Sequence, residues 1–268
     1  MKNTFRILLL ICLSASANAD ENPIGFRSAT LADERNERPL DMVVWYPAKT
    51  TAPAQLIADD AVFVGTSAVR EAPPTAGDHP LLVLSHGFRG NWSNQAWLAS
   101  ALARQGYIVA AVNHPGTTTH DRSPKAAARL WQRPVDISRV IDAVTAQPEQ
   151  FGAVSKGRIE VAGHSLGGWT ALEIAGTRFD PERFAQDCAA HQKLATRLPS
   201  ATSQYVEISN ASHFSFMSLC KPGAVALLEE DSPGDGIICA DGDARSREVI
   251  QQQVVALIDG FLSRSVQN

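Results

Sequence analysis

The sequence predicts an α/β fold with a mostly parallel sheet and helices on both faces. Apolar runs typical of buried strands alternate with segments that carry apolar residues at helical spacing, an order typical of strands joined by helical crossovers. A serine flanked by glycines also lies between one strand and the helix that follows it. The expected strands are residues 25–32, 40–47, 81–84, 107–112, 158–162 and 205–208, and the expected helices are 94–105, 136–146, 168–175 and 247–263.

Residues 1–19 have the pattern of an export signal. Lys2 and Arg6 precede a short apolar core at 7–13, and Ala-Asn-Ala at 17–19 fits a small-x-small cleavage site. The apolar core is too short to span a bilayer. We therefore expect a signal peptide over 1–19, a single domain over 20–268, and a periplasmic or secreted protein in an oxidising compartment.

The charge balance argues against nucleic acid as a partner. The chain has 24 Lys and Arg against 28 Asp and Glu, and cleavage after Ala19 would remove two basic residues, leaving 22 − 28 = −6. No basic run or patch is present to bind phosphates. The closing helix at 247–263 has an apolar stripe that a core-facing role explains better than membrane binding, so no stable membrane insertion is expected.

The expected strands differ in pairing and in whether both of their faces are buried. Residues 25–32 and 40–47 indicate an opening antiparallel pair, whereas 81–84 is a continuous apolar run of the kind buried on both faces. The helix at 94–105 ends at Gly106, and a second buried strand follows it. Parallel strands of this type build their sites at the carboxyl ends, where strand gives way to loop.

Residues 163–167, Gly-His-Ser-Leu-Gly, form the expected nucleophile turn. The sharp strand-to-helix turn holds its serine in a strained conformation, and the flanking glycines leave room for the close packing that it needs. The helix that follows directs its positive end toward Ser165, which favours a developing negative charge there. We expect Ser165 to be a catalytic nucleophile rather than part of a structural turn.

A second glycine-rich loop, residues 85–90, follows the strand at 81–84. In proteins with the serine turn, this position supplies half of the oxyanion hole. The backbone N–H of Phe88 is expected to act with that of Leu166 in holding the oxyanion. The alternative is an ordinary glycine-rich turn in which His86 makes only structural hydrogen bonds.

Chain order narrows the choice of general base. The order serine, acid, histidine leaves only His191 and His213 downstream of Ser165. His213 follows the expected strand at 205–208 by a short loop and is the candidate base. His164 is expected to point away from the serine, and His114 and His120 are interpreted as pocket or surface residues.

Four motifs together resemble the bacterial dienelactone-hydrolase-like group related to platelet-activating-factor acetylhydrolases. They are residues 84–90 (Leu-Ser-His-Gly-Phe-Arg-Gly), 113–116 (Asn-His-Pro-Gly), 163–168 (Gly-His-Ser-Leu-Gly-Gly) and 211–216 (Ala-Ser-His-Phe-Ser-Phe). The resemblance implies an α/β-hydrolase fold, no cofactor, and hydrolysis of short-acyl or lactone esters. Serine at 165, where dienelactone hydrolase itself has cysteine, favours the esterase branch. The resemblance also implies a Cys220–Cys239 disulfide.

The chain departs from that group after the nucleophile helix. Members carry two further strands there, the later one delivering a catalytic aspartate, but residues 177–204 contain no apolar run long enough for either. Asp180, Asp187 and Glu207 are weak candidates, so the triad acid stays unassigned. Cys188 is left without an expected partner, and the cysteine spacing fits no zinc site.

These observations predict an exported serine hydrolase that acts on a small-molecule carboxylic ester without metal or cofactor. Ser165 and His213 carry the chemistry, and the Phe88 and Leu166 amides form the oxyanion hole. The alternative is a catalytically impaired or non-catalytic protein of the same fold, which the missing acid strand favours. A lid-covered lipase is less well supported, because the segment after Ser165 is too short for a cap domain.

Overall fold

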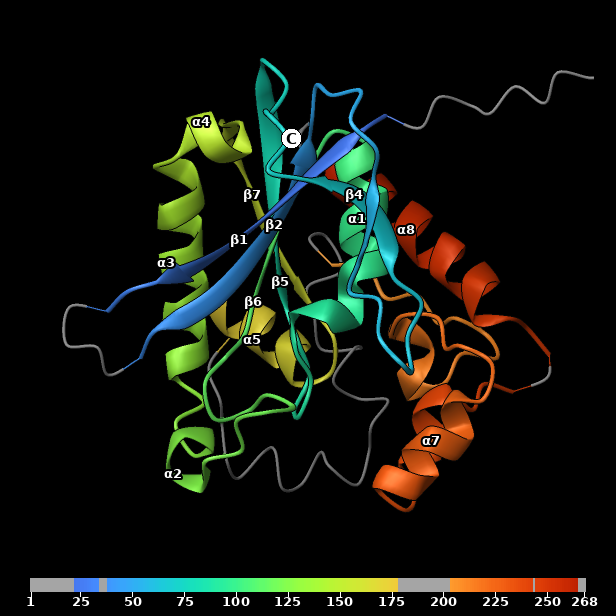
Figure 1. Ribbon diagram of the computed structural model, residues 1–268. Helices are drawn as coiled ribbons and strands as arrows, with labels where there is room; N and C mark the ends of the chain where they lie inside the picture. The colour runs from blue at the N-terminus through green and yellow to red at the C-terminus, as the bar shows by residue number, and fades with distance from the viewer. Residues whose placement is uncertain (1–21, 34–37, 178–202, 243, 265–268) are drawn as a thin grey trace, which may run out of the picture.

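The protein contains one mixed seven-stranded sheet with helices on both faces (Figure 1). The structure, a computed structural model, describes residues 22–33, 38–177, 203–242 and 244–264. The strand order is β3-β4-β1-β2-β6-β5-β7. The bounds are β1 Ile24–Leu31, β2 Leu40–Pro47, β3 Gln55–Ile57, β4 Thr66–Arg70, β5 Asp78–Ser85, β6 Ile108–Val112 and β7 Ala153–Gly163.

The three strands nearest the serine turn are parallel. β5 pairs with β6 on one side and β7 on the other, both in parallel register, and β1 and β2 form the expected antiparallel pair. β2 then joins β6 in antiparallel register. The carboxyl ends of β5 and β7 therefore meet at one edge, where Ser85 is the register partner of Gly163.

Side-chain alternation along β5 divides the core into two layers. Leu82 and Leu84 belong to the layer that includes α1, whereas Leu81 and Val83 belong to the layer that includes α3. Successive residues of a strand point to opposite faces, so a continuous apolar run is needed where both faces are covered. Burying each such side chain contributes about 1.5–3 kcal/mol.

Helices α1 and α8 lie on one face of the sheet, and α3 and α5 lie on the other (Figure 1). The short 3₁₀ helices η1, η3 and η4 lie in the connections. The bounds are η1 Trp92–Gln95, α1 Ala96–Arg104, α2 Pro124–Ala127, α3 Gln132–Thr145, α4 Pro148–Phe151, α5 Leu166–Ile174, η3 His213–Phe216, α7 Ala224–Asp231, η4 Asp235–Cys239 and α8 Arg247–Arg264.

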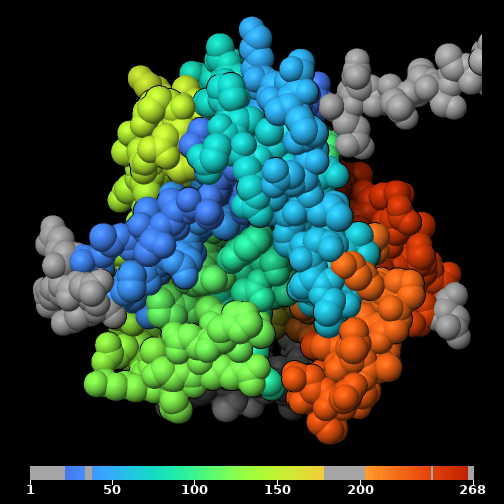
Figure 2. Space-filling model, viewed as in Figure 1, coloured from blue at the N-terminus to red at the C-terminus, as the bar shows by residue number. Residues whose placement is uncertain are grey.

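The loops after β5 and β6, together with α2 and α7, gather at one end of the molecule (Figure 1). In the space-filling view the surface is hollowed between the green segment that contains α2 and the orange segment that contains α7 (Figure 2). Parallel strands end toward this side, so the functional groups at their carboxyl ends collect there.

The prediction of a strand at 205–208 is wrong. These residues adopt no regular structure, and Tyr205 is 67% exposed. A strand needs a neighbour with matching backbone hydrogen bonds, and apolar composition alone does not provide one. Within the described residues β7 is consequently the sheet's last strand on this side, paired only with β5.

The predicted disulfide is confirmed. Cys220 and Cys239 are bonded, with a Cα–Cα separation of 5.8 Å. The bond ties the segment after η3 to the end of η4, just before α8. Cys188 lies outside the described residues.

Candidate active site

Ser165 lies in the sharp turn between β7 and α5 with φ 54° and ψ −120°. This left-handed backbone is rare for a residue with a side chain and is characteristic of strained functional turns. A Cβ on Gly167 would lie 1.8 Å from the Ser85 carbonyl oxygen, and one on Gly163 would lie 2.2 Å from the Gly167 carbonyl carbon. Neither position can accept a side chain, so both glycines are needed for the turn to pack against β5.

The glycine-rich loop after β5 lies directly against the serine turn. The Cβ position of Gly87 is 3.2 Å from the Ser165 Cβ. The Gly87 carbonyl accepts hydrogen bonds from the Gly90 N–H at 3.1 Å and from His86 Nδ1–H at 2.7 Å. In a trans peptide the next N–H points the opposite way. The Phe88 amide therefore points away from these bonds, and no acceptor for it is found in the described part of the chain.

The Leu166 amide supplies a second open donor beside Ser165. Leu166 is the first residue of α5, and the first amides of a helix have no carbonyl within the helix to bind. The predicted oxyanion donors thus belong to the two segments that meet at the serine turn: Phe88 follows Gly87, which approaches Ser165, and Leu166 begins α5. Two such amides can hold a developing oxyanion.

A buried network of polar side chains contacts the glycine-rich loop from the interior of the protein. His114 Nδ1–H donates to Asp136 Oδ2 at 2.9 Å, and the Ser85 hydroxyl donates to His114 Nε2 at 3.0 Å. Asp136 also accepts from Arg38 at 2.6 and 2.7 Å. His114 is 0% exposed, so its interpretation as a pocket or surface residue is wrong. His86 joins the network by accepting the His114 backbone N–H at 3.0 Å.

The two network histidines are neutral near pH 7. Burial lowers the pKa of His114 to about 4, and burial together with the nearby His114 and Arg133 holds the pKa of His86 well below its ordinary value. Burial alone would raise the pKa of Asp136, but hydrogen bonds from His114 and Arg38 outweigh it and lower that pKa. A neutral His86 with its proton on Nδ1 can hold the Gly87 carbonyl while Nε2 accepts a bond.

His213 lies next to the serine turn although no strand delivers it. It begins η3, and the adjacent His164 Nε2–H donates to the His213 carbonyl at 2.8 Å. The rings of His164 and His213 are 4.6 Å apart. His164 connects the turn to the histidine loop through this hydrogen bond. Burial lowers the pKa of His164, and the nearby His213 ring lowers it further; together they outweigh the hydrogen bond to the His213 carbonyl, which raises it.

No carboxylate in the described residues bonds to the His213 ring. Asp241, the carboxylate held against η3, accepts instead from Ser215 at 2.8 Å and from Arg247 at 2.7 Å. Glu207 is exposed. The other candidates for acid or base, Asp180, Asp187 and His191, lie outside the described residues, and His120 is exposed on the surface.

An apolar cavity of about 250 Å³ adjoins Ser165. It lies between the end of β7 and α8, and its walls include Trp97, Phe216, Val254 and Ile258. A neighbouring cavity of about 370 Å³ continues along α8 and shares Phe216, Val254 and Ile258 with the first. Apolar surface beside a nucleophile is suited to the carbon chain of a substrate.

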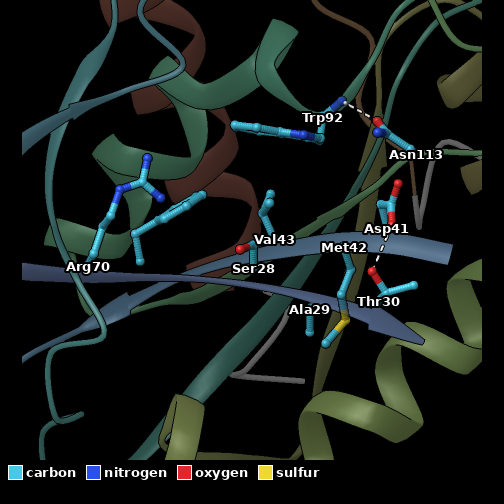
Figure 3. A pocket seen from close by; sticks show the side chains of 10 residues that line it. Ser28, Ala29, Thr30, Asp41, Met42, Val43, Arg70, Trp92 and Asn113 are labelled. Atoms are coloured by element: carbon cyan, nitrogen blue, oxygen red, sulfur yellow. Dashed lines mark hydrogen bonds between the residues drawn. The ribbon is translucent and has the colours of Figure 1, made fainter. Parts of the chain in front are cut away.

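A larger pocket of about 440 Å³ lies over β1 and β2 (Figure 3). Trp92 lies on one side, where its backbone N–H donates to Asn113 Oδ1 at 3.0 Å, and the Thr30 hydroxyl donates to Asp41 Oδ1 at 2.9 Å. Neither Ser165 nor His213 lines it. Because Ser165 lines the cavity of about 250 Å³ and does not line this pocket, we assign the candidate active site to the smaller cavity. In the described residues, no cluster of three His, Cys, Asp or Glu side chains is suited to hold a metal ion.

This arrangement defines an α/β-hydrolase fold. A solved ferulic acid esterase from Streptomyces cinnamoneus superposes with a TM-score of 0.65 over 93% of this chain and 92% of its own, at 22% identity. Residues 92–193 match the prolyl oligopeptidase family.

Curated relatives are similar over part of their length. A bis(hydroxyethyl) terephthalate hydrolase from Streptomyces coelicolor is 27% identical over 52% of this chain and 52% of its own. The cutinase est1 of Thermobifida alba is 25% identical over 50% of this chain and 53% of its own, and est2 is 32% identical over 37% and 31%. The chain thus spans about half the length of the first two relatives. The narrower resemblance to the dienelactone-hydrolase-like group remains a prediction.

No helix among those that the structure describes combines the length and apolar character needed to cross a membrane.

Proposed function

We propose that this chain hydrolyses carboxylic esters with Ser165 as nucleophile and His213 as general base. The observation that carries the proposal is the contact between the strained serine turn and the histidine loop, made by His164 Nε2–H and the His213 carbonyl at 2.8 Å. It holds the only downstream histidine in the described residues against the turn that carries Ser165. The curated relatives and the superposed structure reported above carry the names of ester hydrolases.

In the proposed reaction Ser165 Oγ attacks the ester carbonyl carbon while His213 takes the hydroxyl proton. The negative charge on the carbonyl oxygen is held by the Phe88 and Leu166 amides, each of which contributes on the order of 10²–10³ in rate. The tetrahedral intermediate then expels the alcohol, which receives the proton from His213. Water hydrolyses the acyl-enzyme by the same steps, releasing the carboxylic acid and restoring Ser165.

We propose slow turnover because His213 has no carboxylate partner in the described residues. Removing the acid from a serine triad costs roughly 10⁴ in kcat, while the oxyanion hole and substrate binding persist. The His164 contact fixes the backbone of His213 but leaves its ring without an orienting anion.

The substrate that we propose is a short-acyl or lactone ester. At about 250 Å³ the cavity beside Ser165 lies just below the usual range for small-molecule sites, roughly 300–1,000 Å³. Acyl groups of a few carbons fit it, whereas longer chains would extend into the neighbouring cavity of about 370 Å³. A series of p-nitrophenyl esters from C2 to C12 tests the assignment, with kcat/KM expected to be highest below C6.

We further propose export of a single domain, residues 20–268, to the periplasm or medium after removal of residues 1–19. Support comes from the signal-like start of the sequence and from the Cys220–Cys239 disulfide, since such bonds persist in oxidising compartments. Mass determination of the protein recovered from the periplasm and medium tests this proposal.

The deciding experiment is hydrolysis of p-nitrophenyl acetate by the mature chain beside Ser165→Ala and His213→Ala. Ser138→Ala and His120→Ala are matched controls, because both side chains are exposed and lie outside the site. Loss of turnover in the first pair, with normal turnover in the controls, supports the Ser–His mechanism. Turnover that survives in Ser165→Ala refutes it.

The second candidate function is a hydrolase-fold protein without catalysis, which is favoured because no carboxylate in the described residues bonds to the His213 ring. No turnover above the Ser165→Ala background would support it. Labelling by a fluorophosphonate then distinguishes an activated Ser165 from an unreactive one, because only an activated hydroxyl reacts.

A further inference from the structure

Arg133 is a buried cation that connects the two sides of the candidate oxyanion hole. Its side chain is on α3, and the residue is 2% exposed. Nη2 donates to the His86 carbonyl and, at 3.1 Å, to Ser85 Oγ. Nε donates to Thr170 Oγ1 at 3.0 Å, and Nη1 donates to Thr117 Oγ1 at 2.7 Å.

The first group of contacts fixes the glycine-rich loop. Arg133 holds the His86 carbonyl, and the His86 ring holds the next carbonyl, that of Gly87, at 2.7 Å. With two successive carbonyls held by hydrogen bonds, the planar Gly87–Phe88 peptide fixes the direction of the Phe88 N–H. An oxyanion hole works only when its donors are oriented before the reaction.

The second group of contacts reaches the nucleophile helix. The Thr170 hydroxyl accepts from Arg133 and donates to the Leu166 carbonyl at 3.2 Å. Leu166 is the other predicted oxyanion donor. One planar guanidinium therefore spans from the loop to α5, and its rigid fork geometry fixes the separation between them.

The charge of Arg133 is not neutralised by a direct partner. No carboxylate in the described chain forms an ion pair with it, and the acceptors that bind it are hydroxyls and a carbonyl. Burial lowers the pKa of Arg133 to about 10, so it stays protonated at neutral pH. The carboxylates of Asp136 and Glu173 raise its pKa through space without bonding to it. A buried cation whose direct partners are all neutral is costly, and at this position the charge lies behind a site where negative charge would develop.

We infer that Arg133 is a positioning residue for ester hydrolysis, which sets the spacing of the Phe88 and Leu166 amides and places a positive charge behind the oxyanion hole. The inference rests on the proposed function and adds to it a residue that does not touch the substrate. It acts on the transition state, so it changes kcat more than KM.

The test compares Arg133→Lys and Arg133→Met with Arg139→Lys. Arg139 is an arginine of the same helix that likewise donates to backbone carbonyls, those of Leu31, Ala32 and Arg38, and has no bond to the glycine-rich loop or to α5 in the described residues. The measurements are kcat and KM for p-nitrophenyl acetate, the dissociation constant of phenylboronic acid, and the melting temperature. Phenylboronic acid forms a tetrahedral anionic adduct with an active serine.

We expect both Arg133 variants to lose about 10²-fold in kcat, with KM within about 3-fold, as when an oxyanion donor is removed. The affinity for phenylboronic acid should fall in parallel, while Arg139→Lys keeps both values. An unchanged kcat, or an equal loss in Arg139→Lys, would overturn the inference.

Two further variants cover the case in which the Arg133 variants do not fold. Thr170→Val removes the hydroxyl between Arg133 and Leu166 at nearly constant volume, and Thr170→Ser retains it. We expect kcat to fall in the valine variant and to be kept in the serine variant, and equal kcat in the two would refute the coupling. Wild-type protein that neither turns over ester nor binds phenylboronic acid would overturn the proposed function, and this inference with it.

Discussion

The buried His114 predicts a specific loss of stability in acid. Its ring is neutral in the folded protein, with a pKa of about 4, whereas in the unfolded chain the ordinary value of 6.5 applies. Between these values the unfolded chain binds a proton that the folded protein does not, so stability falls as the pH falls from 6.5 toward 4. Above pH 6.5 both states are neutral and the group has no effect.

The size of the effect follows from the two pKa values. Their difference is 6.5 − 4 = 2.5, and at about 1.36 kcal/mol for each pH unit the whole loss is about 3 kcal/mol. At pH 5 about 2 kcal/mol of it should be visible. His114→Asn removes the titration while the amide can still donate to Asp136.

Urea unfolding of wild type and His114→Asn at pH 8 and pH 5 measures this pH-dependent loss of stability. The free energy of unfolding of wild type should fall by about 2 kcal/mol more than that of the variant between the two pH values. His86 and Asp136 remain in both proteins, but His114 also lowers their pKa values, so the difference reports His114 together with its effect on these two neighbours. Equal pH dependence in the two proteins would show that His114 is not held neutral by its surroundings.

Two further predictions test the packing of the serine turn and the contribution of the Cys220–Cys239 disulfide. Gly167→Ala places a Cβ 1.8 Å from the Ser85 carbonyl oxygen, so we expect the turn to shift, the free energy of unfolding to fall by about 1–3 kcal/mol, and esterase activity to be lost. Gly242→Ala is the control, because the space around Gly242 is open. Equal melting temperatures and activities in the two variants would contradict the prediction. Replacing Cys220 and Cys239 by serine opens a loop with a sequence separation of 19, which should lower the free energy of unfolding by about 3 kcal/mol in urea titrations, and an unchanged midpoint would count against it.

Local sequence was enough to predict the serine turn and the main sheet. Gly163, Ser165 and Gly167 are close in the chain, and the steric demand of a strand-to-helix turn acts within those few residues. The apolar run at 81–84 likewise predicted a strand covered on both faces, which β5 is. The structure that such short-range patterns specify depends mainly on residues close together in the chain.

The strand at 205–208 and the position of His114 were predicted wrongly for a common reason. Tyr205 and its neighbours have strand-like composition, but a strand forms only where another edge is free and aligned. The burial of His114 depends on Asp136, Ser85 and Arg38, which come from distant parts of the chain. No local pattern reports which polar groups will meet in the interior.

The sequence by itself determined the α/β fold, the strained serine turn and the candidate oxyanion amides, because glycine placement and apolar periodicity act over short spans of chain. Only the tertiary structure decided that the His213 carbonyl meets His164 at 2.8 Å, and that Arg133 spans the glycine-rich loop and α5. These contacts join residues that lie 37 to 49 positions apart in the chain. They exist because packing of the sheet and helices brings the groups together and burial makes their hydrogen bonds obligatory.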